Sequence, residues 1–206
     1  SHSVTGFQLN GARFEKTHVT DDLSVSITGE LNDVELLGGS IGGDITIDGT
    51  GGSNGVRINS TVAGDVRIDL NGLGDRIRLE ADANSPLHIG GSVFVNLDTD
   101  TLDLTGNNGA STAVVGGDFV VTGSGGTLSF VSSTVSGHLL ATLSGESSIT
   151  SALHPIFNQI GGNMVVDFSA GSGSANLLYF NVAHDLVVRG GSGVEDVRLN
   201  NVRAGN

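Results

Sequence analysis

The stretch Ile41-Gly-Gly-Asp-Ile-Thr-Ile47 joins a glycine pair and an acid to three residues that alternate as in a very short strand. The same pattern returns along the chain in degenerate form, beginning each time at an apolar anchor residue. A unit of this size cannot bury its own apolar side chains, so we expect the units to stack as the coils of a solenoid. The eight anchors lie 20–27 residues apart and are Val19, Ile41, Val62, Ile89, Val115, Val135, Ile160 and Val182.

A second short strand follows most anchors after about 13–15 residues. The clear examples are Val34-Glu-Leu36, Val56-Arg-Ile58, Ile77-Arg-Leu79, Leu102-Asp-Leu104, Leu128-Ser-Phe130 and Val197-Arg-Leu199. In the sixth and seventh coils the pattern is weaker and marks Ser148-Ile149-Thr150 and Leu177–Phe180. Short β-branched strands without helical periodicity predict an all-β fold, a right-handed parallel β-helix of about eight coils. The alternative, an antiparallel sandwich, has strands at similar spacing but no reason to repeat one corner.

We expect a single domain over residues 1–206. Residues 1–18 would form a partial coil or cap, 19–201 the regular coils, and 202–206 the start of a further coil or a tail. The first residues, Ser1-His2-Ser3, lack the basic and apolar pattern of a signal peptide. Because neither end has a clear capping element, the sequence favours a segment of a longer protein.

The repeated corner, an apolar residue followed by x-G-D and then apolar-x-apolar, resembles that of the parallel β-helix superfamily over residues 19–201. This superfamily includes pectate-lyase-like enzymes and the passengers of bacterial surface proteins. The resemblance implies a right-handed coil, and it carries no catalytic motif.

Composition limits the partners and the location. The formal net charge is −13 and Lys16 is the single lysine, so the surface repels phosphate backbones and no nucleic-acid partner is expected. There is no run of about 18 apolar residues, so no transmembrane segment is expected. The chain has no cysteine, and therefore neither a disulfide nor a thiolate metal site. The glycine-rich, acidic composition fits a secreted or cell-surface bacterial protein and is also compatible with a cytosolic one.

The third position of the corner is glycine in six copies, which predicts a backbone with positive φ there. The two other copies have Asp21 and His184, which tolerate that region better than most residues. The fourth position is polar, and we expect its side chain to cap backbone N–H groups of its own corner. Its occupants are Asp22, Asp44, Asp65, Ser92, Asp118, His138, Asn163 and Asp185.

Two stretches are weak candidates for calcium. The stacked acids Asp22, Asp44 and Asp65 could hold Ca²⁺, although Ser and Asn later in the same column favour capping. The stretch GGSGVEDV, residues 190–197, resembles the calcium-binding nonapeptide repeat, with Glu195 in place of the expected Asp. Since it occurs only once, a simple corner is the better interpretation. We therefore expect no cofactor, with calcium as the alternative.

The middle residue of the first strand in each coil points outward. In the first three coils this residue is polar, and in the next five it is apolar. These five residues, named the apolar stripe, are Phe94, Val120, Leu140, Val165 and Val187. An exposed stripe roughly 20 Å long predicts contact with a second subunit or a neighbouring domain. The alternative is that a loop of the same chain covers it.

The outward residues of the second strand begin with a mixed-charge series. They are Arg13, Glu35, Arg57, Arg78 and Asp103, which predict a ladder of ion pairs on a solvated face. The alternative is an acidic-sugar site around Arg57 and Arg78.

Three longer loops, residues 80–88, 105–114 and about 152–159, are expected at one corner, where function in repeat folds often lies. They would bring Glu80, Asp82, His88 and His154 near Asp98, Asp100 and Asp103. These are the weak candidates for general acid–base catalysis on a polysaccharide; a non-catalytic binding surface is the alternative. Nucleophile motifs are absent, and the chain has one tyrosine and no tryptophan, which disfavours a strong sugar-binding module.

The sequence therefore favours a non-enzymatic role: a structural or adhesive segment of a secreted or surface bacterial protein that associates through the apolar stripe. A polysaccharide lyase or glycoside hydrolase is the second interpretation. A calcium-stabilised binding module is the third.

Overall fold

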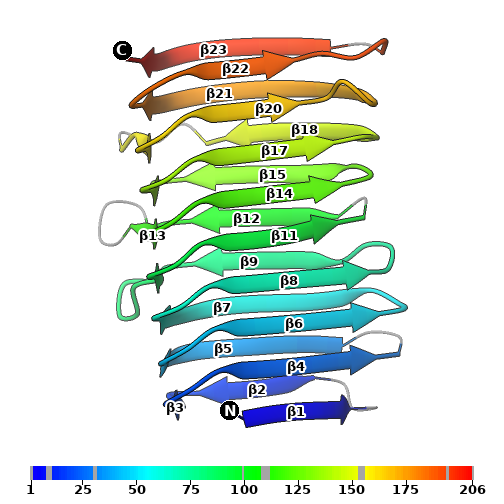
Figure 1. Ribbon diagram of the computed structural model, residues 1–206, viewed down its shortest axis with the longest axis vertical. Coiled ribbons are helices and arrows are strands. Elements are labelled where there is room, and N and C mark those ends of the chain that lie inside the picture. Colours follow the sequence, from blue (N-terminus) through cyan, green and yellow to red (C-terminus); the bar gives the residue numbers. More distant parts are fainter. Residues whose placement is uncertain are drawn as a thin grey trace.

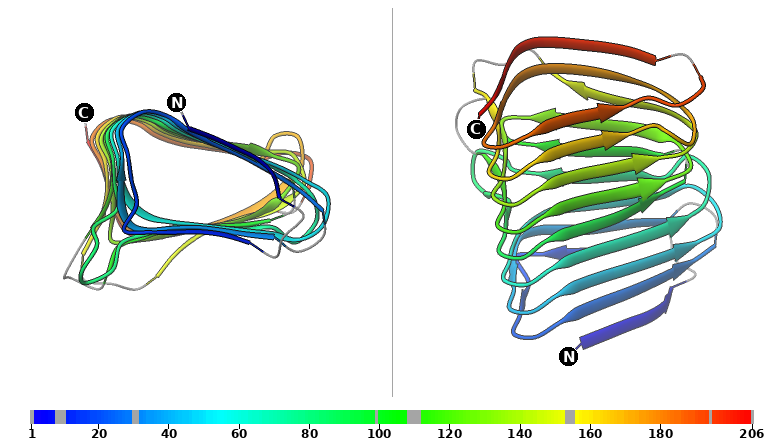
Figure 2. Two further views of the ribbon diagram at one scale, coloured as in Figure 1. Left: turned by 90° about the horizontal axis from the view of Figure 1, so that it is seen from below. Right: turned by 45° about the horizontal axis from the view of Figure 1, so that its top comes forward.

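The computed structural model describes residues 2–7, 11–29, 32–98, 100–107, 112–152, 156–193 and 195–205. These residues form β-strands and no helix, and the strands stack in parallel as a right-handed β-solenoid of about eight turns (Figures 1 and 2). The fold class predicted from the sequence is confirmed. No helix of the described residues is long and apolar enough to cross a membrane.

Each coil has three sides, so the solenoid is triangular in cross-section (Figure 2). The first face is a sheet of nine strands in order along the axis. They are β1 (His2–Phe7), β4 (Leu23–Thr28), β6 (Ile45–Thr50), β8 (Val66–Asn71), β11 (Val93–Leu97), β14 (Phe119–Gly123), β17 (Leu139–Leu143), β20 (Met164–Asp167) and β22 (Leu186–Arg189).

The second and third faces form one continuous sheet, because four long strands bend from one face to the other. The strands of the second face are β2 (Ala12–Glu15), β5 (Asn32–Ile41), β7 (Asn54–Val62), β9 (Arg76–Glu80), β12 (Thr101–Thr105), β15 (Gly126–Val131), β18 (Glu146–Ser151), β21 (Ser172–Val182) and β23 (Glu195–Ala204). The third face has the ends of β5, β7, β21 and β23 together with β3 (His18–Val19), β10 (His88–Ile89), β13 (Ala113–Val115), β16 (Ser133–Val135) and β19 (Asn158–Ile160).

The eight anchors form one column on the third face. Each pairs in register with the next, from Val19 with Ile41 to Ile160 with Val182. All eight are buried, with at most 9% of their surface exposed. The 20–27-residue repeat is thus confirmed, insertions included, because an apolar residue in this column is covered by the coils above and below.

The core is a single stack of inward-facing apolar side chains that runs the length of the solenoid. Its middle contains an aromatic column in which Phe130 meets Phe119 and Phe180 edge to face, with ring centroids 5.8 Å and 6.0 Å apart. Such edge-to-face pairs add to the gain from burying the rings. The most exposed inward-facing residues lie in the last coil, where Val197 and Leu199 are 45% and 53% exposed.

The expectation of positive φ at the glycine of the corner is wrong. The six glycines have ordinary backbone angles and are required by close approach instead. A Cβ at any of them would overlap the capping atom of the preceding coil, such as Asp44 Oδ1 at Gly64. The eighth coil has His184 at this position, and its N–H bonds to Gly162 O at 3.3 Å, longer than the 2.8–3.1 Å of the other coils.

Left-handed residues occur at a different bend, between the second and third faces. Lys16, Gly38, Ser132, Tyr179 and Asn201 have φ between 48° and 63° there. Four of them carry a side chain, so the pattern of glycines gave no signal for this bend.

The segments marked for coils six and seven, 148–150 and 177–180, lie within β18 and β21, but the register within these strands differs from the one expected. The residues in register with Leu128-Ser-Phe130 are 149–151 and 175–177. The apolar alternation is obscured because Ser151 and Ala175 occupy inward positions. Ser151 is compatible with burial because its Oγ accepts a hydrogen bond from Leu178 N at 2.7 Å and donates one to Leu178 O at 2.9 Å.

Candidate functional site

The polar residue at the fourth corner position caps the next coil, and not its own corner as expected. Asp22 Oδ1 accepts a hydrogen bond from Asp44 N at 3.0 Å, and Asp44 Oδ1 accepts one from Asp65 N at 2.8 Å. The same bond continues through every later coil, with Ser92, Asp118, His138 and Asn163 as acceptors. His138 accepts through Nδ1, which places its ring proton on Nε2. We call this column the capping ladder.

The capping ladder gives Asp22, Asp44 and Asp65 a structural role, since each uses one carboxylate oxygen on a backbone N–H. Among the residues that the structure describes, no group of three or more His, Asp and Glu side chains is arranged to hold a metal ion. In the nonapeptide-like stretch, Glu195 Oε1 accepts a hydrogen bond from Gly191 N at 2.8 Å and so closes the corner itself. Val194 of this stretch lies outside the described residues.

A second polar column, which sequence reasoning missed, is buried at the bend that leads into the second face. Asn32, Asn54, Asp75 and Asp100 follow one another in register there, and each is at most 5% exposed. Asn32 Nδ2 donates to Asn54 Oδ1 at 3.3 Å, and Asn54 Nδ2 donates to Asp75 Oδ1 at 3.2 Å. The signal was a polar residue directly before each second strand, which also fits an exposed turn.

The two aspartates of this column differ in the hydrogen bonds that their carboxylate oxygens accept. Asp100 Oδ1 accepts hydrogen bonds from Gly74 N and Asp75 N, at 3.0 Å and 2.7 Å. Asp75 Oδ2 is buried without a hydrogen-bond partner. Loss of hydration raises the pKa of both carboxyl groups above 3.8, the ordinary value for aspartate. Burial therefore disfavours two charges in this column, although backbone N–H groups at Asp100 oppose this effect.

The candidate catalytic residues do not converge. Glu80 ends β9 and pairs with Arg57, whereas Asp98 and Asp100 precede β12, whose end pairs with Glu80 through Thr105. A whole strand, roughly 16 Å, therefore separates them. Asp103 points outward from the middle of β12 and pairs with Arg76 at 3.1 Å.

Of the remaining candidates, Asp82 accepts hydrogen bonds from Asn84 N and Ser85 N, both at 2.8 Å, and so shapes its own loop. His88 is exposed on β10, and His154 lies outside the described residues. The loop at residues 80–88 projects from one corner of the triangle, and the described ends of the other two longer loops leave and rejoin the coil at the same corner (Figure 2). Beside them, Phe157 packs edge to face on Tyr179 at 5.5 Å, with the Arg203 guanidinium 5.3 Å from the Phe157 ring.

The apolar stripe lies where the sequence placed it. Phe94, Val120, Leu140, Val165 and Val187 pair in register on five successive strands of the first face. All five are half-buried, because the coils above and below flank them. No described segment crosses the outer side of this face (Figure 2). The Arg67 guanidinium lies 4.8 Å from the Phe94 ring and borders the stripe at one end.

The predicted ladder of ion pairs is only partly present. Glu35 lies between Arg13, at 3.6 Å, and Arg57, at 3.8 Å. Asp103 is in register with Arg78 but pairs with Arg76. Within the part of the chain that the structure describes, no ion pair or hydrogen bond engages Arg78. The series of ion pairs therefore breaks at Arg78.

No family model, no curated protein and no solved structure matches this chain. The strand pairing alone therefore shows the architecture.

Proposed function

We propose that this protein is a non-catalytic structural β-solenoid whose first face binds a second copy of the chain through the apolar stripe. The observation that carries the proposal is five apolar side chains in register on an open, regular sheet. A rod with such a face suits an adhesive or scaffolding segment of a secreted or surface bacterial protein. The candidate acids lie apart, on both ends and in the middle of the second face, which supports this role better than hydrolysis or elimination.

The flanking residues favour an antiparallel arrangement of the two copies. On each of six successive strands, the residue two positions after the middle outward residue is polar. These polar residues form a row that begins at Asp69 and ends at Arg189. A two-fold axis along the strands, between Val120 and Leu140, would place Val120 against Leu140 of the second copy. The same axis would place Asp69 opposite Arg189 of the second copy, which brings opposite charges together across the interface.

The area suffices for a specific dimer. Six coils about 4.8 Å apart, each with a strand about 17 Å long, give a flat overlap of roughly 500 Å² per copy. The two copies together would bury roughly 1,000 Å² before surface relief is counted, which reaches the lower end of specific interfaces. The apolar stripe forms its centre and the polar row its rim, as in known interfaces.

Leu140→Glu should weaken the dimer at least about 100-fold, because two carboxylates would meet beside the axis without partners. Sedimentation equilibrium of wild type and variant measures this change. The matched control is Thr46→Glu, which has the same outward position on the same face but lies beyond the six-coil overlap. We expect it to dimerise like the wild type.

A monomeric wild type would refute the proposal. So would a Leu140→Glu protein that dimerises as tightly as wild type, since the contact would then lie elsewhere. The exposed apolar end of the solenoid around Leu199 is the alternative contact surface. If Leu199→Asp abolishes the dimer and Leu140→Glu does not, the contact lies at that end.

A further inference from the structure

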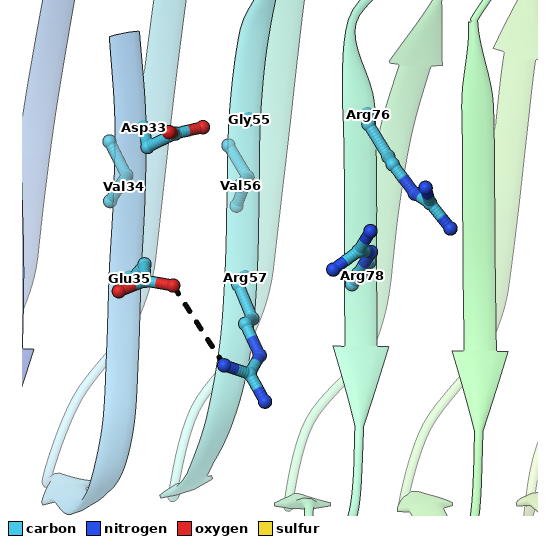
Figure 3. A pocket seen from close by; sticks show the side chains of 8 residues that line it. All are labelled: Asp33, Val34, Glu35, Gly55, Val56, Arg57, Arg76 and Arg78. Carbon is cyan, nitrogen blue, oxygen red and sulfur yellow. Dashed lines mark ion pairs between the residues drawn. The ribbon is translucent and has the colours of Figure 1, made fainter. Parts of the chain in front are cut away.

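The outer side of the second face contains a hollow of about 300 Å³ over β7, between β5 and β9 (Figure 3). It exists because Gly55 stands in register between Asp33 and Arg76 and has no side chain. The Asp33 carboxylate reaches over this gap, so a Cβ at Gly55 would overlap Asp33 Oδ1. Arg76 extends away from the gap, toward β12, where it meets Asp103 (Figure 3).

The walls of the hollow concentrate positive charge on an acidic protein. Arg57, Arg76 and Arg78 line it, three of nine lysine and arginine residues in a chain of net charge −13. Arg57 is held by Glu35 and Glu80, and Arg76 by Asp103.

Arg78 is the exception in this arrangement. It is half-buried and in register with Arg57, so two like charges face each other on adjacent strands. Such a pair destabilises a sheet. Asp103 is in register on the other side of Arg78 but pairs with Arg76, and among the described residues no ion pair engages Arg78. An anionic ligand at this point would offset the repulsion between Arg57 and Arg78.

The other walls restrict what the anion can be. A guanidinium forms two parallel hydrogen bonds with a carboxylate. Asp33 and Glu35 lie across the hollow and can accept hydrogen bonds from hydroxyl groups, and they repel a doubly charged phosphate more strongly than a singly charged carboxylate. The volume is at the lower end of small-ligand sites.

We propose that this hollow binds a small hydroxylated monocarboxylate such as a free sugar acid. The carboxylate contacts Arg78, and the sugar hydroxyls donate to Asp33 and Glu35. Since the hollow lies on the second face, ligand and second copy occupy different sides of the solenoid.

Titration of the ¹⁵N-labelled protein with D-glucuronate tests this site. We expect saturable shifts of the amides of Gly55 and Arg78, while D-glucose gives none and inorganic phosphate binds at least about tenfold more weakly. Arg78→Gln should weaken glucuronate binding about tenfold or more, because the bidentate partner is lost. It should not lower the melting temperature, because a like-charge contact is removed with it.

The matched control is Arg198→Gln, the same change in the same outward row of the last coil, where Arg198 pairs with Asp196 at 2.8 Å. It should leave glucuronate binding unchanged. Gly55→Ala fills the hollow while keeping every charge, and should also weaken binding. The proposal is overturned by any of three results: no saturable shifts with glucuronate, equal or tighter binding of phosphate or glucose, or equal losses in Arg78→Gln and Arg198→Gln.

Discussion

Gly64→Ala is expected to lower the free energy of unfolding by about 3 kcal/mol, the upper end of the usual cost of overpacking. Its Cβ would overlap Asp44 Oδ1 and lie 2.9 Å from both the carbonyl carbon and the carbonyl oxygen of Gly43. The coil must then separate from its neighbour, or the Asp44 carboxylate must leave Asp65 N. Denaturant unfolding monitored by circular dichroism measures the loss.

The control is His184→Ala, which changes the same corner position in the one later coil that already carries a side chain there. It should stay within about 0.5 kcal/mol of wild type. In an Asp44→Ala background, Gly64→Ala should cost less, because the overlapping oxygen is absent, although the backbone contacts remain. A Gly64→Ala protein as stable as wild type would show that close approach does not explain these glycines.

The second large effect is a gain of stability. Asp75→Asn should raise the free energy of unfolding at pH 7 by about 1–3 kcal/mol, the penalty of a buried polar group without a partner. The amide oxygen keeps the acceptor for Asn54, and a neutral amide replaces a carboxylate whose Oδ2 is buried without a partner. The buried amide column would then extend from Asn32 to position 75.

The pH dependence follows from the direction of the pKa shift. Burial raises the pKa of Asp75 above 3.8, so the folded protein binds more protons than the unfolded chain just above that pH. The contribution of Asp75 is therefore fully present below about pH 4 and is lost as the pH rises through the raised pKa. Unfolding free energies of wild type and Asp75→Asn should diverge over that interval. If the difference is the same at every pH from 3 to 8, the charge of Asp75 is not its cause.

Much of the fold was predictable because the anchor residues of all coils stack in one buried column. An anchor such as Ile89 must be apolar in every coil, so the register was readable through insertions as long as the loop at residues 80–88. The outward apolar stripe was predictable for the same reason, since the residue between two inward positions has only one direction to face.

What the sequence could not reveal depends on contacts between coils. In a sequence, a glycine that leaves room for an oxygen of the preceding coil cannot be distinguished from a glycine that adopts a positive φ. The role predicted for Gly64 was therefore wrong. The direction of a capping side chain, as at Asp44, is likewise invisible in one copy. Charged neighbours also choose partners diagonally: Asp103 pairs with Arg76 and leaves Arg78 to line a hollow. The acids proposed for catalysis were expected to lie close together because their positions at the start or the end of a strand were not taken into account. Glu80 ends its strand, whereas Asp98 and Asp100 precede theirs.

The distance between the two copies at one labelled position tests the antiparallel dimer most directly. The chain has no cysteine, so Thr46→Cys carries a single nitroxide on the first face, outside the proposed overlap. Thr46 and its copy would be seven coil spacings apart across sheets about 10 Å distant, so electron–electron double resonance should give about 35 Å. A separation near 10 Å would indicate parallel solenoids, and the absence of an intermolecular signal would contradict the dimer itself.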